Sequence, residues 1–419
     1  MSGGVRAAGA SSPPRQETPP VRGALSNSGR RIAGIRPIGL AWLTVLAAMV
    51  LSVIGVYAIH VGDPPGSATR FGLSSIAIRQ VVYLVVGVCG AVVIAIPNPK
   101  LIRALAPPAF VALIGALVFL LVPFVPEVLV TPRNGARAWI NLGVADIQPS
   151  ELCKIAYVLV IAGYLRYRTE HRTLVGLLPL AAITFIPIAL ITLQPDLGTS
   201  SLFVPSLFAM VLAAGARLRH LVLIVACAAL AAPAAYPLLQ PHQKQRLVAM
   251  VRMVQGDQTT ADDINFQSFT AQALVGAGGT TGLPAEKSRA LVYYTRLPEQ
   301  HNDMIFSVIV NRFGLVGGLT VLGAYLAWIV GALVTAGQTK DPFLRLTVVG
   351  VTGFIAAQMT INIGMNIGVL PIIGITLPFV SYGGSSLLTC WLMTGLVVSA
   401  GIRRGGPPHR PSFEFGDGL

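Results

Sequence analysis

One short run of the chain carries three ionisable side chains directly before a long apolar segment. It contains Glu299, His301 and Asp303, and the apolar segment begins at residue 304. Asp303 is expected where water gives way to lipid, and partial desolvation there raises a carboxylate pKa and makes a better base. The alternative is a helix N-cap, where the macrodipole favours Asp. The spacing leaves both interpretations open, with Asp303 as a candidate catalytic base or a helix cap.

A second polar group precedes and opens the fourth apolar segment. It includes Arg137 and Trp139, followed by Ser150, Glu151 and Lys154. Ser150 is in place to cap a helix, and Glu151 and Lys154 are three residues apart on one helical face, so they can pair. Two interpretations stay open. The pair makes a polar helix tolerable in a bundle, or it forms a polar floor for an anionic ligand.

Two further motifs combine small and polar residues. Asp196 lies between apolar segments and is costly there unless it is hydrogen-bonded or hydrated, so it either caps the next helix or belongs to a polar site. Residues 383–386 read Gly-Gly-Ser-Ser and offer free N–H groups and hydroxyls at a helix start, an arrangement that binds anions. The alternative is a simple loop turning into the last helix. P-loop, GxSxG, HExxH and Rossmann motifs are absent from the sequence.

The composition indicates what must position these side chains. The 419 residues are 54% hydrophobic and only 11% charged, against about 25% charged in soluble domains. This excludes a soluble enzyme and a disordered protein, and continuous apolar runs argue against a β-barrel. The net charge of +14 is explained by Lys and Arg flanking membrane helices rather than by nucleic-acid binding. We predict an all-α polytopic membrane protein, with four cysteines that form neither a disulfide framework nor a metal site.

Ten apolar segments of membrane-helix character follow a basic, Gly/Ser/Pro-rich tail at 1–38 that we expect to be disordered. The predicted segments are 39–60, 76–96, 101–124, 152–165, 174–193, 199–214, 219–239, 304–334, 343–368 and 383–402. If both termini are cytoplasmic, 18 of the 30 Lys and Arg residues lie on the cytoplasmic side, as the positive-inside rule requires. The transmembrane domain is then 39–404, followed by a cytoplasmic tail at 405–419.

The region at 240–303 is longer than a connector needs to be, and we predict a structured extracytoplasmic element there. It contains Gln267, Ser268 and a glycine-rich turn that includes Gly278 and Gly279. The segment that follows, 304–334, is long enough to tilt or break and contains Gly314.

Together these motifs resemble those of one family. The stretches are GARAWINLG with QPSELCK, LQPDLGTS, FQS with GAGG and LPEQHNDMIF, and GITLPFVSYGGSS, on ten segments with a long loop before the eighth. In this order they resemble the shape, elongation, division and sporulation family of bacterial wall polymerases, which includes FtsW, RodA and SpoVE. The resemblance covers roughly 39–404, and QPDLGTS and LPFVSYGGSS look closer to RodA than to FtsW.

The resemblance implies a peptidoglycan glycosyltransferase that polymerises lipid II on the outer face of the bacterial inner membrane. It implies a class B penicillin-binding protein as partner, contact with membrane lipids, and a role in cell shape, division or sporulation. Asp303 takes the place of the family's key acidic residue, and Arg137, Lys154 and the 383–386 helix start would stabilise the diphosphate. No cofactor is implied, and participation of a divalent cation stays open. The candidate substrate-binding residues are Arg137, Trp139, Glu151, Lys154, Asp196, Gln267, Ser268, Gly278, Gly279, Glu299, His301, Ser381, Gly383, Gly384 and Ser385.

The sequence departs from the family pattern after the key Asp and in the outer loop. Asn311 and Arg312 replace a Glu-Glu pair, Asn302 replaces a threonine, and Leu283 and Pro284 follow Gly282 where the family has a lysine. Two other functions are compatible with the sequence. A flippase of lipid-linked precursors would use intramembrane Glu151, Lys154, Asp196 and Arg312 as a polar path, and a scaffold would regulate the penicillin-binding protein without catalysis.

Overall fold

The structure of the protein is a computed structural model. It describes Gly3 and residues 39–403, except for 65–66, 68, 70–71, 127, 131, 133–135, 142, 144–145, 169, 236, 238–243, 245–247 and 249–265. The tails expected at 1–38 and 405–419 therefore lie outside the described residues, apart from Gly3, and so does most of the first half of the outer region.

The described chain is a bundle of apolar helices. Before the outer region they are α1 (Ala41–Gly62), α2 (Ser75–Ala95), α3 (Pro99–Leu121), α4 (Pro149–Leu165), α5 (Leu178–Leu193), α6 (Leu197–Ser201), α7 (Phe203–Ala213) and α8 (Leu218–Ala235). After it come α10 (Phe266–Gly278), α11 (Ala285–Thr295), α12 (Ile305–Gln338), α13 (Pro342–Asn366) and α14 (Gly384–Ile402). Short 3₁₀ helices, η1 (Glu170–Arg172) and η2 (Val175–Leu177), precede α5. Strands β1 (Ile140–Asn141) and β2 (Asp146–Ile147) pair antiparallel just before α4.

Seven helices of the described chain are long and apolar enough to cross a membrane. Two shorter apolar stretches, Leu197–Ala213 and Leu218–Cys227, accompany them. Valine and leucine side chains project outward along the bundle, and Val93, Val111 and Leu230 are each more than 65% exposed. Such a surface needs lipid around it, so the prediction of a polytopic α-helical membrane protein is confirmed.

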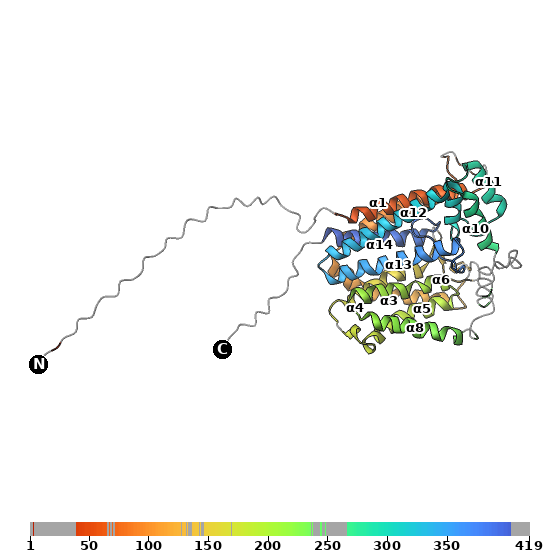
Figure 1. Ribbon diagram of the computed structural model, residues 1–419. Coiled ribbons are helices and arrows are strands. Elements are labelled where there is room, and N and C mark those ends of the chain that lie inside the picture. Colours follow the sequence, from red (N-terminus) through yellow and green to blue (C-terminus); the bar gives the residue numbers. More distant parts are fainter. Residues whose placement is uncertain are drawn as a thin grey trace.

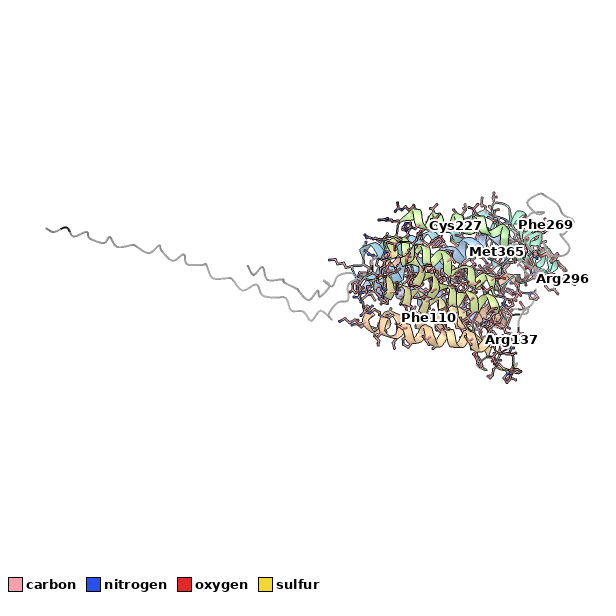
Figure 2. All side chains as sticks on the ribbon, turned by 90° about the horizontal axis from the view of Figure 1, so that it is seen from below. Phe110, Arg137, Cys227, Phe269, Arg296 and Met365 are labelled. Atoms are coloured by element: carbon pink, nitrogen blue, oxygen red, sulfur yellow. The ribbon has the colours of Figure 1, made fainter. Side chains whose placement is uncertain are left out.

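The bundle has two distinct ends. Figure 1 shows the start of α1 and the end of α14 at one end, with α10 and α11 at the other. Helix α1 packs along α12, α14 packs along α2, and α13 lies between α4, α7 and α12. Figure 2 places Arg137 and Arg296 toward the end that carries α10 and α11. The loops that hold the candidate residues therefore gather at the end opposite the start of α1.

Helix α12 is broken at Gly314, whose φ of 67° and ψ of −164° belong to a region that essentially only glycine adopts. The turn between α10 and α11 fills the break. The Leu315 N–H donates to the Gly279 carbonyl (2.9 Å), and the Leu283 N–H donates to the Asn311 carbonyl (3.0 Å). Of the two expectations for this segment, a tilt or a break, the structure shows a break at Gly314, and hydrogen bonds join the turn between α10 and α11 to it.

Candidate active site

Asp303 lies in the last turn before α12 and is held from α13. Its backbone carbonyl accepts one hydrogen bond from Asn362 Nδ2 (2.9 Å) and one from Asn366 Nδ2 (2.8 Å). Asn366 also accepts from the Ser307 N–H at 3.1 Å, so it fixes the first turn of α12 as well. The N-cap of α12 is Met304, with no side-chain cap, so the alternative that Asp303 caps this helix is wrong.

The Asp303 carboxylate is half-buried and receives no hydrogen bond from the described residues. It faces Gly374: a Cβ built there would lie 3.6 Å from Asp303 Oδ2. Burial, followed by the nearby negative charges of Glu299 and Asp196, raises the pKa of Asp303 to about 7. A carboxylate with this pKa and no donor partner is suited to accept a proton near neutral pH.

The loop at 375–383 wraps over the turn that carries Asp303. Ser381 Oγ donates to the Asn302 carbonyl (2.6 Å), and the Tyr382 N–H donates to the His301 carbonyl (2.8 Å). Gln80 Nε2, from α2, donates to the Ser381 carbonyl at 2.9 Å. Ser381 joins two loops through its hydroxyl, and its expected contact with a ligand stays a prediction.

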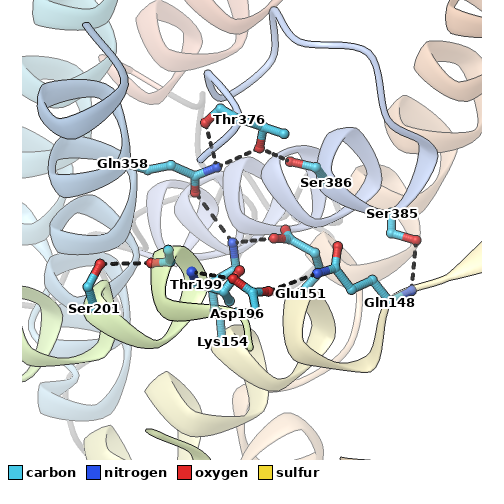
Figure 3. A network of polar contacts seen from close by, with 11 residues as sticks. Gln148, Glu151, Lys154, Asp196, Thr199, Ser201, Gln358, Thr376, Ser385 and Ser386 are labelled. Carbon is cyan, nitrogen blue, oxygen red and sulfur yellow. Dashed lines mark hydrogen bonds and ion pairs between the residues drawn. The ribbon is translucent and has the colours of Figure 1, made fainter. Parts of the chain in front are cut away.

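A buried polar network joins α4, α13 and the 375–383 loop (Figure 3). Lys154 Nζ donates to Glu151 Oε1 at 2.8 Å and to Gln358 Oε1 at 3.4 Å, so the predicted pairing on α4 is confirmed. Gln358 Nε2 in turn donates to Thr376 Oγ1 at 3.0 Å. Lys154 is only 1% exposed and Glu151 only 4%, so the pair joins α4 to α13 inside the bundle.

Asp196 links Gln148, which precedes α4, to the start of α6. Its Oδ1 accepts from the Thr199 N–H (2.9 Å), so the predicted helix cap is confirmed, and its Oδ2 accepts from Gln148 Nε2 (3.3 Å). Burial raises the pKa of Asp196 although Thr199 donates to it. Gly198 brings α6 against the backbone at Ile373, beside the Gly374 that faces Asp303, because a Cβ there would lie 2.6 Å from the Ile373 carbonyl.

The start of α14 completes the wall of the site. Ser385 Oγ accepts from the Gln148 N–H (3.1 Å) and donates to the Asp146 carbonyl (3.0 Å), while the Gly383 N–H donates to Gln80 Oε1 (3.3 Å). Gly384 lies against the ring of Tyr83, where a Cβ would be 3.1 Å from a ring carbon. Both predicted glycines and Ser385 thus join the helix start to α2 and to the β1–β2 hairpin.

Other predicted residues lie farther from Asp303 or have protein partners. Arg137 donates to the Val125 carbonyl (3.2 Å) and the Pro123 carbonyl (3.4 Å), which ties down the turn after α3. Trp139 is half-buried just before β1. Glu299 is exposed, and its Oε2 accepts from Asn302 Nδ2 at 2.6 Å.

The glycine-rich turn does not meet Asp303. Gly278 packs against α12, where a Cβ would lie 2.2 Å from the Val310 carbonyl, and Gly279 bonds to Leu315. Val310 lies five residues after the start of α12, a rise of about 7.5 Å along the helix. Gln267 and Ser268 lie in the first turn of α10.

Sequence reasoning missed the side chains that position Asp303. Gln358, Asn362 and Asn366 are spaced by four in an otherwise apolar segment, so they share one helical face. That spacing was the available signal. Within the described residues, no group of three His, Cys, Asp or Glu side chains is arranged to hold a metal ion.

Comparisons with known proteins agree with this architecture. The model of the FtsW/RodA/SpoVE family of cell cycle proteins matches residues 40–404. Stage V sporulation protein E of Bacillus subtilis is 30% identical over 360 residues, covering 85% of this chain and 95% of that protein. Peptidoglycan glycosyltransferase RodA of Treponema pallidum is 28% identical over 448 aligned residues, covering 89% and 100%. These identities are similar, so the expected closeness to RodA stays a prediction.

The fold is also that of a solved structure. The chain matches a protein in a structure described as "Structural coordination of polymerization and crosslinking by a peptidoglycan synthase complex", with a TM-score of 0.72 and 28% identity. The match covers 87% of this chain and 98% of that one. The family model, the relatives and the fold lead to one conclusion: the chain belongs to the FtsW/RodA/SpoVE family of cell cycle proteins.

Proposed function

We propose that the protein is a peptidoglycan glycosyltransferase that polymerises lipid II on the outer face of the bacterial cytoplasmic membrane. Family membership supports this, as does near full-length similarity to a relative named peptidoglycan glycosyltransferase. The observation that carries the proposal is the half-buried Asp303 carboxylate, which is held by its backbone and has no hydrogen-bond donor in the described chain.

In the proposed reaction, a sugar hydroxyl of the acceptor attacks the anomeric carbon of the donor. A new C–O bond forms, the bond from that carbon to the diphosphate breaks, and the hydroxyl proton passes to Asp303. A base works best when its pKa lies near the working pH, and the pKa of Asp303 is about 7. Asn362 and Asn366 hold the backbone from which the carboxylate projects, which lowers the entropic cost of reaching the reactive geometry.

The leaving diphosphate needs positive potential. The first N–H groups of α14 lack intrahelical partners and form the positive end of a helix dipole. We place the diphosphate at this helix start, around Gly384 and Ser385, because anions bind readily at such ends. Arg137 and Lys154 are less suited to this contact, because their donors already bind protein carbonyls and Glu151.

For the membrane we propose ten crossings with both termini in the cytoplasm. The described helices coincide with the ten apolar segments, and the loops at the end of the bundle away from Asp303 are rich in Lys and Arg. Asp303 then faces the outer side. We further propose a class B penicillin-binding protein as partner, because the structural neighbour belongs to a complex of polymerisation and crosslinking.

The test uses purified protein, its penicillin-binding partner and fluorescent lipid II, with glycan length followed on gels. Wild type should make polymer and Asp303→Ala should make none. Asp341→Ala is the matched control, because Asp341 also precedes a helix but lies at the other end of the bundle. A wild type that makes no polymer refutes the proposal. Lipid II crossing liposomes without polymerisation would favour a flippase, and normal cell shape with Asp303→Asn would favour a scaffold.

A further inference from the structure

The turn at 299–304 is anchored on two sides. Helix α13 and the 375–383 loop hold it through Asn362, Asn366 and Ser381, as described above. The end of α1 holds the other side. His301 Nε2 lies 3.1 Å from Asp63 Oδ1, and Gln300 Nε2 donates to the Gly62 carbonyl at 2.8 Å.

Asp63 is a buried carboxylate at the C-terminal end of a helix, where acidic residues are disfavoured. It is the C-cap of α1 and only 4% exposed. The negative end of the helix dipole and burial both disfavour a carboxylate there. Burial alone raises the pKa of Asp63, but hydrogen bonds with His301 and Ser74 outweigh it, so the pKa falls below its usual value. Burial and the helix dipole disfavour the charged Asp63 carboxylate, and the contact with His301 stabilises it.

The fit between His301 and α1 is close. A Cβ on Gly62 would lie only 2.8 Å from His301 Cε1, so the imidazole rests directly on the last turn of the helix. His301 is two residues from Asp303, and its own carbonyl is bonded by Tyr382. His301 and Asp303 therefore lie on one short stretch of backbone that hydrogen bonds hold in place. A shift of the His301 side chain would move this backbone and, with it, the Asp303 carboxylate.

We infer that Asp63 is a positioning residue for the Asp303 carboxylate. Through the contact of its Oδ1 with His301 Nε2 it fixes the 299–304 turn against the end of α1, apart from the contacts that Asn362 and Asn366 make from α13. This assignment rests on the proposed function, in which Asp303 is the base. It also gives His301, expected at first to contact substrate, a role in holding the turn.

The kinetic test compares Asp63→Ala, Asp63→Asn and His301→Ala in the polymerisation assay. Misplacing a reacting group by about 1 Å costs on the order of 100-fold in rate, so Asp63→Ala should lower kcat about 10- to 100-fold. KM for lipid II should stay within about twofold, because substrate binding is untouched. Asp63→Asn keeps an oxygen that accepts from His301 and should stay within about threefold of wild type. The Asp63→Ala/His301→Ala double variant should be no worse than the poorer single variant.

A second readout does not depend on activity. Hydrogen exchange in a peptide covering 297–304 should be faster in Asp63→Ala than in wild type and unchanged in Asp341→Ala. Unchanged exchange, an unchanged kcat, or a rise in KM alone would overturn the assignment. If Asp63→Ala does not fold, His301→Ala removes the same pair from its more exposed partner and is judged by the same outcomes. Polymerisation by wild type but not by Asp303→Ala would support the proposed function regardless of the results for Asp63. A failure of the Asp63 assignment can therefore be distinguished from a failure of the proposed function.

Discussion

Replacing Asp303 by Asn should stabilise the folded protein at alkaline pH while removing the base. Burial, with the charges of Glu299 and Asp196, raises the pKa of Asp303 from 3.8 to about 7 on folding. The folded chain therefore holds this proton more tightly than the unfolded chain, and stability is lost as the pH rises toward 7. At 1.36 kcal/mol per pKa unit, the loss reaches about 4 kcal/mol by pH 8.

The Asn side chain stays neutral, so it escapes this loss. Unfolding of the purified variants in detergent would be measured at pH 4.5 and pH 8. The stability of Asp303→Asn relative to wild type should grow by about 3 kcal/mol between these values. Asp341→Asn, at the start of α13, shows whether any Asp-to-Asn change before a helix has the same effect. A pH dependence shared by wild type and Asp303→Asn would refute the reasoning, because Asp303 would then titrate normally.

Three further changes test other parts of the account. The polymerisation rate of wild type should fall as the pH is lowered, with a midpoint near pH 7. Glu299→Gln should move that midpoint to lower pH, because it removes one negative charge that raises the pKa of Asp303. A curve of rate against pH measures both. Lys154→Ala should destabilise the fold by about 3–5 kcal/mol, since it leaves Glu151 charged and buried, and replacing both by apolar residues should cost less in the same unfolding assay. Gly314→Ala should lower the unfolding temperature, because alanine disfavours the backbone conformation of Gly314 and would clash with the turn between α10 and α11. Gly323→Ala is the control and should not lower it, because a Cβ at Gly323 would have no neighbour within 4 Å.

The helices were largely predictable because apolar runs of membrane length are a strong signal. Every predicted segment has a helix in the structure, and Glu151 and Lys154 pair as their spacing requires. Local capping was predicted less well. Asp196 caps α6 as expected, but α4 begins at Pro149, and the Ser150 hydroxyl caps nothing within the described residues. The helix starts at Pro149, two residues earlier than it would with Ser150 as its N-cap.

The positioning of Asp303 was not predictable, because it depends on contacts between residues far apart in the sequence. Asn362 and Asn366 lie 59 and 63 residues from the carbonyl that they bind, and Asp63 pairs with a histidine at the end of the outer region. Sequence spacing shows that polar residues share a face of α13, but it does not show what they meet. The hydrogen bond of the Gly279 carbonyl was not predictable for the same reason, because its donor, the Leu315 N–H, lies at a break in another helix.

The central claim is that the Asp303 carboxylate removes the proton from the acceptor sugar. The most direct measurement is polymer formation from labelled lipid II by wild type and by Asp303→Asn, both folded and both bound to the same penicillin-binding partner. Wild type should make glycan polymer and Asp303→Asn none, because the amide has a similar shape but cannot act as the base. Polymer made by Asp303→Asn at a rate close to that of wild type would contradict it.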